Sequence, residues 1–302
     1  IGDVNGLKLI NDAFGHRDGD ELLTSVTNLL KQSCREEDII ARWGGDEFAI
    51  LLPQTSEEDA LQLYKRIKNN CRQTGSYPLQ ISISLGVATK EYAWQNTLDI
   101  LKEAEDRMYR NKLLEHKSNR SVFITSLEKT LWMKSHETRE HTTRLRRMVV
   151  RLGQAVNLPE NERDNLTLLA SLHDIGKIGI PKSILDKVGS LSPEEWEIIK
   201  KHPEIGYRIA LSSPDLSPIA DSILMHHERW DGSGYPLGKK GEDIPLNARI
   251  LAIADAYDVM VNGRPYQKSM SYKEALKEIE RCAGTQFDPD LAEIFIACQS
   301  KK

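Results

Sequence analysis

The chain has 302 residues, about twice the length of a typical domain, so we expect two domains of ordinary size. Its formal net charge of -4 provides no basic field of the kind that holds polymeric DNA or RNA, which excludes that partner but not a small nucleotide. Its four cysteines are widely separated and no apolar run approaches the ~18 residues that span a membrane, so we expect a protein of the reducing cytoplasm.

The first residues indicate a piece of a longer protein. Ile1, Gly2 and Asp3 are typical of the end of a strand, yet no residues precede them to begin it. We therefore expect a fragment, and the parent protein could carry a membrane anchor outside this sequence.

Helices of the first half are predicted from their caps. Asp20 is a candidate N-cap for a stretch with one apolar face, and Ser56, followed by three acidic residues, is a candidate for another. Thr97 is predicted to begin a further helix.

Strand patterns lie between these helices. The runs 39–42 and 48–52 flank Gly44-Gly45 and predict a hairpin, and apolar alternation over 81–87 predicts one more strand. The order helix, helix, hairpin, helix, strand, helix predicts an α/β domain built on one sheet, over residues 1–117.

The second half is predicted to be all-helical. Ser192, Ser217 and Asp288 each precede a proline, which is typical of an N-cap followed by proline at the first helical position. A charged, helix-favouring stretch over 118–135 predicts a helical connector, and 136–302 a helical domain.

Histidines and carboxylates gather in this second half, where six of the eight histidines lie. Glu137 and His141 are four apart in a predicted helical stretch, so both are expected on one face, although such a pair alone is usually solvated. His173-Asp174 and His226-His227 each end an apolar helix, and Asp255 lies within an apolar run. Buried polar groups need partners, so these positions indicate a metal site, the alternative being capped core histidines.

The candidate ligands exceed the needs of one ion. With His202 added they are Glu137, His141, His173, Asp174, His202, His226, His227 and Asp255. An ion that keeps an open position cannot use them all, so two or three ions are expected, and nitrogen and oxygen donors suit iron, manganese or zinc. Closely spaced ions suit displacement at phosphorus, and Lys177, one turn beyond Asp174, is placed to meet a phosphate.

Two segments of this half resemble the signatures of the HD-GYP family. They are His173-Asp174-Ile175-Gly176-Lys177 and the run from His226 through Gly234-Tyr235-Pro236, and the resemblance extends from about Ser121 to Phe295. It implies an HD-type helical bundle that hydrolyses cyclic di-GMP to linear pGpG and then GMP.

The resemblance also implies roles for single residues. The eight candidate ligands match the family's metal positions, with Asp174 as the bridging carboxylate and Glu137 as a mark of three-metal members. Asp174 and Lys177 are expected to be catalytic. Lys177 and Arg264 match positions that grip the substrate phosphates, and Tyr235 lies in the loop for which the family is named.

Acidic residues mark the predicted hairpin of the first half. The run from Arg42 to Phe48 places two glycines, Asp46 and Glu47 at the tip, and Asp3 ends the first predicted strand. Paired carboxylates at strand ends hold two magnesium ions in the palms of nucleotidyl-transferring enzymes, whereas the alternative is a simple turn.

With 3–8, 10–12, 19–20 and 106–112, this motif resembles the GGDEF family of diguanylate cyclases over residues 1 to about 120. The resemblance implies a palm-like fold and condensation of two GTP molecules into cyclic di-GMP, each GTP bound by one subunit of a homodimer. By matching positions, Asp3, Asp46 and the Val4 carbonyl would hold magnesium. Glu47 would assist the attacking hydroxyl. Asn11 and Asp20 would bind guanine, and Lys112 would contact phosphate.

Arg35 and Asp38 stand at the offset of the inhibitory site at which members of this family bind their product, although a four-residue charge run is usually just solvated. His116 occupies a place where an arginine commonly contacts phosphate.

Three hypotheses follow for the whole chain. It is a bifunctional cyclase and phosphodiesterase, or a phosphodiesterase whose first half binds GTP or cyclic di-GMP as a regulatory module, or a non-catalytic receptor. Degraded ligand sets would mark the receptor, and this sequence has intact ones. The residues do not decide between cyclic di-GMP and cyclic GMP-AMP as substrate of the second half.

Overall fold

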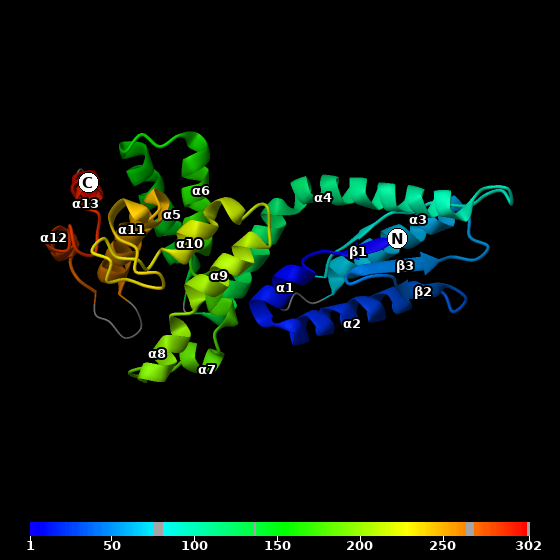
Figure 1. Cartoon of the computed structure of the whole chain (residues 1–302), viewed down its shortest axis with the longest axis horizontal. Coiled ribbons are helices and arrows are strands. Elements are labelled where there is room, and N and C mark those ends of the chain that lie inside the picture. Colours follow the sequence, from blue (N-terminus) through cyan, green and yellow to red (C-terminus); the bar gives the residue numbers. More distant parts are fainter. Residues whose placement is uncertain (75–80, 136, 264–268, 301–302) are drawn as a thin grey trace. The chain divides into compact units, whose positions relative to one another are not determined.

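A computed structural model describes residues 1–74, 81–135, 137–263 and 269–300 of the chain. The chain divides into two compact units, Ile1–Ser126 and Leu127–Lys302 (Figure 1).

The first unit is built on a four-stranded sheet in the order β2-β3-β1-β4. All the pairings are antiparallel, and the strands are β1 (Gly2–Val4), β2 (Ile39–Arg42), β3 (Glu47–Leu51) and β4 (Ile83–Leu85). Because β1 lies between β3 and β4, the acidic end of the first strand faces the acidic start of β3, with Asp3 opposite Glu47. The sheet therefore places Asp3 and Glu47 at the same register on adjacent strands.

Helices complete this unit, and they are α1 (Leu7–Phe14), α2 (His16–Ser33), α3 (Glu57–Gln73) and the first part of α4 (Thr97–Lys134). The apolar side of α2, including Val26 and Leu30, is buried in the core. The predicted cap at Ser56 is confirmed, since its Oγ accepts a hydrogen bond from the Asp59 N–H. The predicted start at Thr97 is confirmed as well.

The predicted cap at Asp20 is wrong. Helix α2 begins at His16, with Gly15 in the N-cap position, so Asp20 lies in the second turn and is exposed. The reason is the backbone of Gly15, whose φ of 94° ends α1 and lets α2 begin five residues earlier than predicted.

Helix α4 runs for 38 residues without interruption. The stretch 118–135, proposed from its composition as a connector, corresponds to the second part of this helix and the residue that follows it.

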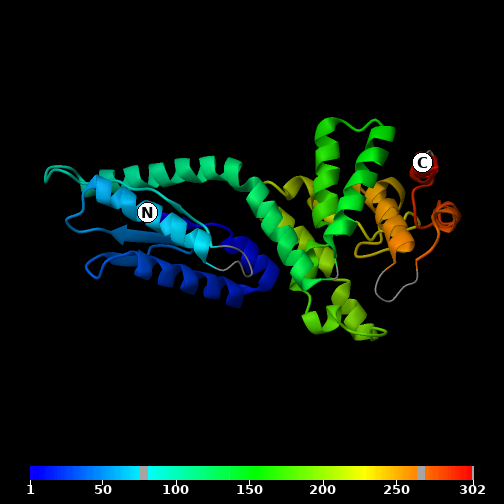
Figure 2. The same cartoon turned by 180° about the vertical axis from the view of Figure 1, so that it is seen from behind.

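The second unit is helical. Its α-helices are α5 (Arg139–Ala155), α6 (Glu160–Leu172), α7 (Lys182–Leu185), α8 (Pro193–Ile199), α9 (His202–Leu211), α10 (Ala220–Leu224), α11 (Leu246–Asn262), α12 (Tyr272–Arg281) and α13 (Pro289–Gln299), and its 3-10 turns are η1 (Ile175–Gly179), η2 (Ser217–Ile219) and η3 (Gly241–Asp243). Helices α5 and α6 lie side by side (Figure 2), and α11 packs against both. Fully buried Leu145, Leu152, Leu166 and Leu169 fill this core. The prediction of an α/β domain followed by an all-helical bundle is confirmed.

Two of the three predicted caps in this unit are confirmed. Ser192 forms a reciprocal capping box with Glu195, and the Asp288 carboxylate accepts hydrogen bonds from the backbone at the start of α13. The prediction for Ser217 is wrong, because this residue is the first of the 3-10 turn η2 and its hydroxyl donates to the Pro214 carbonyl instead.

Within the described ranges, no helix combines the length and the apolar character that crossing a membrane requires. All four cysteines are free thiols.

Candidate metal centre

The ends of several helices in the second unit converge on one cluster of polar side chains. His173 and Asp174 follow α6, His202 is the first residue of α9, and His226 follows α10. Gly176 makes this convergence sterically feasible, since a Cβ there would lie 1.8 Å from the His202 carbonyl oxygen. The absence of a side chain at Gly176 lets η1 lie directly against α9 and brings His202 beside Asp174.

One group of candidate ligands is formed by Asp174, His202, His226 and His227, whose ligand atoms all lie within 4.8 Å of one another. The Asp174 Oδ1 atom is 3.1 Å from His202 Nε2 and 3.8 Å from His226 Nε2. The two imidazole Nε2 atoms of His202 and His226 are 3.3 Å apart.

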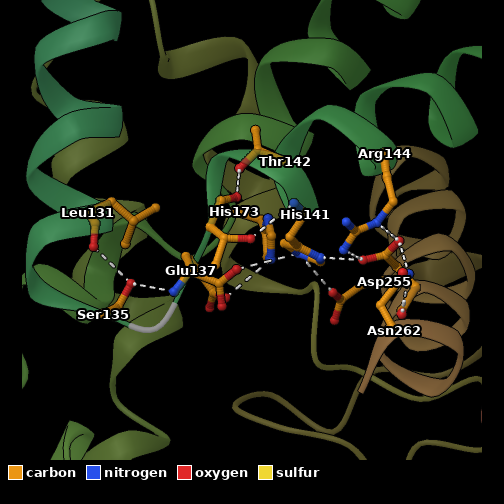
Figure 3. Close-up of polar contacts among 12 residues, drawn as sticks. Leu131, Ser135, Glu137, His141, Thr142, Arg144, His173, Asp255 and Asn262 are labelled. Carbon is orange, nitrogen blue, oxygen red and sulfur yellow. Dashed lines mark hydrogen bonds and ion pairs between the residues drawn. The ribbon is translucent and has the colours of Figure 1, made fainter. Parts of the chain in front are cut away.

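A second group is formed by His141, His173 and Asp255, again with ligand atoms within 4.8 Å of one another. His141 Nε2 lies 3.4 Å from Asp255 Oδ1 and 3.4 Å from Glu137 Oε2 (Figure 3). Glu137 therefore faces this group.

Asp174 lies between the two groups. Its Oδ2 atom is 3.2 Å from His173 Nε2, whereas its Oδ1 atom is 3.1 Å from His202 Nε2. One carboxylate thus presents one oxygen to each group, which is the arrangement expected of a bridging ligand.

The donor atoms fit divalent metal ions. His141 Nε2, both ring nitrogens of His173, Asp174 Oδ1 and Asp255 Oδ1 are buried, and within the described part of the chain none of them makes a hydrogen bond of acceptable geometry. Leaving such atoms buried and unpaired is costly, and imidazole nitrogens facing carboxylate oxygens are the usual ligands of zinc, iron and manganese. The cluster could therefore hold divalent ions.

Backbone carbonyls fix the orientation of two imidazoles. His202 Nδ1 is 2.7 Å from the Ile199 oxygen, and His226 Nδ1 is 2.6 Å from the Ile223 oxygen. A carbonyl only accepts hydrogen bonds, so each Nδ1 carries a proton, and in the neutral ring Nε2 is the nitrogen that can present a lone pair to the cluster.

Neighbouring charges in the cluster shift the pKa values of its side chains. Burial alone would raise the pKa of Asp174, but Lys177 and His173 hold it well below its usual value. Burial alone would lower the pKa of His173, but Asp174 and the neighbouring carboxylates raise it to about 9. Burial lowers the pKa of His226 and His227, which keeps these imidazoles neutral.

Lys177 joins the two sides of the cluster. Its Nζ atom is 2.9 Å from Glu137 Oε1 and 2.7 Å from Asp174 Oδ2. The ammonium group expected to meet a phosphate is thus held by two carboxylates of the cluster.

The prediction that Glu137 and His141 share one helical stretch is wrong for Glu137. Helix α5 begins at Arg139, and Thr138 caps it by accepting a hydrogen bond from the His141 N–H. Glu137 lies before the helix, where its N–H donates to Ser135 Oγ at 3.3 Å (Figure 3). Its side chain nevertheless reaches His141, through the loop conformation.

Acidic residues of the first unit lie at the ends of neighbouring strands. The Val4 N–H donates to the Asp46 carbonyl at 2.8 Å, and the Trp43 N–H donates to the Glu47 carbonyl at 2.8 Å, which closes the hairpin tip beside β1. Lys112 Nζ is 2.8 Å from Asp3 Oδ1. The expected magnesium ligands Asp3, Val4 and Asp46 therefore lie on neighbouring strand ends, next to Glu47 and with Lys112 against Asp3.

The predicted guanine-binding and inhibitory residues lie outside the strands of this unit. A Cβ at Gly19 would lie 2.0 Å from Asn11 Oδ1, so glycine leaves room for the Asn11 side chain beside the segment that leads to Asp20. The Arg35 N–H donates to Asp38 Oδ2 at 2.8 Å, so the expected inhibitory pair forms a turn before β2.

A family model described as an HD domain matches residues 125–291, more than half of the chain. The chain belongs to the HD-domain family. A second model, described as the diguanylate cyclase GGDEF domain, matches residues 1–120. The HD-GYP and GGDEF resemblances read from the sequence are confirmed.

Several curated relatives are phosphodiesterases. A cyclic di-GMP phosphodiesterase of Thermotoga maritima is 44% identical over 167 residues, which are 55% of this chain and 45% of that protein. A Vibrio cholerae cyclic di-GMP phosphodiesterase is 38% identical over 202 residues, 62% of this chain and 41% of the relative. A 3'3'-cGAMP-specific phosphodiesterase of the same organism is 36% identical over 188 residues, 62% of this chain and 36% of the relative. The chain thus spans less than half the length of these relatives.

The HD domain contains a cavity of about 250 Å³ beside the cluster. Residues that the sequence reading did not select line it, namely Glu228, Arg229 and Gln286. Glu228 adjoins His227 in the chain and was hidden by its place in a charged, turn-rich run. Its Oε1 atom accepts a hydrogen bond from the Leu237 N–H at 2.6 Å.

Of the substrate-binding residues predicted in the HD domain, Tyr235 lies within the described residues and Arg264 does not. The Tyr235 ring stacks on the His227 imidazole, with centroids 4.9 Å apart and planes 25° apart, so it lies against the cluster. Arg264 lies outside the described residues. Asp258, which was not predicted from the sequence, contacts His141 and lies one helical turn from Asp255 on α11.

Proposed function

We propose that the HD domain hydrolyses cyclic di-GMP to linear pGpG and then GMP, with two or three divalent metal ions held at the cluster. The position of Asp174, with one oxygen toward each group of ligands, carries this proposal. The names of the relatives support cyclic di-GMP as the substrate.

The eight candidate ligands divide between the groups. One ion would be held by Asp174, His202, His226 and His227, and a second by His141, His173 and Asp255, with Asp174 bridging. Glu137 would decide whether a third ion is held, because it faces the second group from the opposite side to α11. Iron or manganese, and zinc as an alternative, suit these donors.

Such ions, when bound, supply hydroxide at neutral pH and neutralise phosphate charge. Lys177 would place its ammonium group beside a phosphate oxygen while Glu137 and Asp174 hold it in position. Tyr235 would cover His227 and line the substrate path, and Arg264 would contact the second phosphate.

The test is chromatography of the products formed from cyclic di-GMP by the iron- or manganese-loaded protein. We expect pGpG followed by GMP, and a parallel reaction with cyclic GMP-AMP compares the two substrates. Intact cyclic di-GMP after incubation with protein of verified metal content would contradict the proposal.

We further propose that the GGDEF domain makes cyclic di-GMP from two GTP molecules in a homodimer. The pairing of Asp3 with Glu47 across β1 and β3, next to Lys112, favours this activity. Magnesium would be held by Asp3, Asp46 and the Val4 carbonyl, and Glu47 would assist the attacking hydroxyl. Asn11 and Asp20 would read guanine.

The alternative is a phosphodiesterase whose GGDEF half is a regulatory module for GTP or cyclic di-GMP, with Arg35 and Asp38 forming the product site. Supplying GTP with magnesium separates the two. Formation of cyclic di-GMP supports the cyclase, whereas GTP binding without product supports the module.

A further inference from the structure

A buried carboxylate outside the ligand set holds His141. Asp258 Oδ2 is 2.8 Å from His141 Nδ1, and the Asp258 side chain is itself bound by Arg144 through two bonds, Nε to Oδ1 at 2.7 Å and Nη2 to Oδ2 at 2.8 Å. Asn262 Nδ2 adds a bond to Asp258 Oδ1 at 3.0 Å. Figure 3 shows Arg144 and Asn262 on the far side of His141 from Glu137.

We propose that Asp258, held by Arg144, is a positioning residue that orients His141 and sets the metal affinity of the second group. This inference rests on the proposed metal centre. It assigns a role to two residues that are not themselves ligands.

The chemistry of the contact dictates the form of the imidazole. An ionised carboxylate only accepts hydrogen bonds, so Nδ1 of His141 carries the proton. In the neutral ring, which a metal requires, Nε2 keeps its lone pair; this atom lies 3.4 Å from Glu137 Oε2 and 3.4 Å from Asp255 Oδ1, and it makes no hydrogen bond in the described part of the chain. The neutral imidazole is thus presented to the cluster by the nitrogen that a metal would use.

His141 differs from the two histidines that are held by carbonyls. His202 and His226 donate to neutral backbone oxygens, whereas His141 donates to a charged oxygen. A carboxylate partner raises the basicity of the opposite ring nitrogen more than a carbonyl does, which strengthens its bond to a metal. Arg144 counters part of this charge and fixes the plane of the Asp258 carboxylate through its two parallel bonds.

Stability alone does not account for this network. Burying an ion pair contributes little to folding, because desolvation offsets the attraction. Helix α11 also contributes Arg249 to a second arginine–aspartate pair, in which Arg249 Nη1 is 2.6 Å from Asp288 Oδ2 at the start of α13, and within the described residues neither side chain contacts a candidate ligand. Arg249 therefore serves as the control for Arg144.

The experiment measures manganese binding by calorimetry and metal content by elemental analysis, for the wild type, Asp258→Asn, Asp258→Ala, Arg144→Gln and Arg249→Gln. We expect Asp258→Ala to weaken one class of sites about 10–100-fold and to leave the other class unchanged. Asp258→Asn, which keeps the volume and an accepting oxygen, should fall between it and the wild type. Arg144→Gln should weaken the same class, and Arg249→Gln should bind manganese as the wild type does.

A second background separates positioning from support of the fold. In a His141→Ala chain, Asp258→Asn should have no further effect on manganese affinity, because the residue through which Asp258 acts is gone. An additional loss in that background, an equal loss at both classes of sites, or affinities within about threefold of the wild type in Asp258→Asn and Asp258→Ala would overturn the inference. Circular dichroism verifies folding, and Asp258→Asn with Arg144→Gln decide the matter if Asp258→Ala does not fold.

The manganese content of the wild-type protein separates the role of Asp258 from the proposed hydrolysis of cyclic di-GMP. A wild-type protein that binds manganese but leaves cyclic di-GMP intact would remove the proposed function and leave the role of Asp258 standing. A wild-type protein that binds no divalent metal would remove both.

Discussion

At the scale of single residues, the candidate metal centre depends on which atoms are left without hydrogen bonds. The Nδ1 atoms of His202 and His226 donate hydrogen bonds to backbone carbonyls, and Nδ1 of His141 donates to the Asp258 carboxylate. Each then turns Nε2 toward carboxylate oxygens. These three histidines therefore share one orientation, whereas neither ring nitrogen of His173 has a hydrogen-bond partner within the described residues.

Asp174→Ala should remove the carboxylate that faces both groups of ligands. We expect metal content to fall and hydrolysis of cyclic di-GMP to drop by about 10²–10³-fold or more. Elemental analysis and product chromatography measure the two effects. Asp164→Ala, at an exposed position on α6, is the control. Wild-type turnover in metal-loaded Asp174→Ala would contradict the assignment.

Glu137→Ala should reduce metal binding without removing the first group, because Glu137 faces only the second. We expect about one metal equivalent per chain to be lost, measured by elemental analysis after dialysis. Unchanged stoichiometry and affinity would show that Glu137 serves to hold Lys177 rather than a metal.

Metal binding should release a proton from His173. The neighbouring Asp174 and other carboxylates, acting against burial, raise the pKa of this imidazole from 6.5 to about 9 in the metal-free protein. Its proton therefore stabilises the metal-free fold fully below pH 6.5, and that contribution is lost as the pH rises through about 9. Coordination requires the neutral ring, so metal affinity should rise with pH across this window.

Calorimetry of manganese binding in buffers of different ionisation enthalpy measures this proton. Close to one proton should be released per chain at pH 7, and almost none at a pH well above 9, because half of the His173 rings still carry the proton at about pH 9. His226 and His227, whose pKa values are lowered by burial, should contribute none. Equal release at both pH values would contradict the prediction.

At the scale of elements, the cluster is assembled by close backbone contact between η1 and α9. Gly176 and Gly206 lie at this contact, where a Cβ on Gly176 would be 1.8 Å from the His202 oxygen and 2.6 Å from the Gly206 nitrogen. Both obstacles are backbone atoms, so they cannot move aside as a side chain would. The position of His202 relative to Asp174 therefore depends on glycine.

Gly176→Ala should force η1 away from α9. We expect a loss of about 3 kcal/mol in the free energy of unfolding and weaker metal binding by the first group. Gly153→Ala on α5 is the matched control, because the nearest atom there is the end of the Leu166 side chain at 3.0 Å. Chemical unfolding followed by circular dichroism compares the two, and equal stabilities would rule out the steric argument.

At the scale of the whole molecule, the two candidate sites, for which we propose opposite reactions, lie in separate compact units. Each unit has its own buried core. The two activities should therefore respond to separate substitutions.

Glu47→Gln should lower formation of cyclic di-GMP from GTP by at least about 10²-fold and leave hydrolysis of added cyclic di-GMP unchanged. Asp174→Ala should do the reverse, so that cyclic di-GMP accumulates from GTP instead of proceeding to pGpG. Chromatography of both variants with both substrates measures this separation. A loss of hydrolysis in Glu47→Gln would show that the two sites are coupled.

Local patterns in the sequence are sufficient to predict the fold class of both halves and the two families, because apolar periodicity, proline-linked caps and the two signatures each involve residues that are close in the chain. Ser192 and Asp288 cap their helices as predicted, since the capping side chain and its partners are close in the chain. Asp20 and Ser217 failed because a positive φ at Gly15 and a hydroxyl bond to Pro214 override the local preference.

The division of the candidate ligands into two groups, the position of Glu137 before α5 and the contact between Asp258 and His141 depend on the tertiary structure. Asp174 faces two groups because η1 packs on α9, and Asp258 reaches His141 across 117 residues of sequence. Such contacts arise from the packing of helices that are distant along the chain, and no local pattern encodes the distance between their side chains.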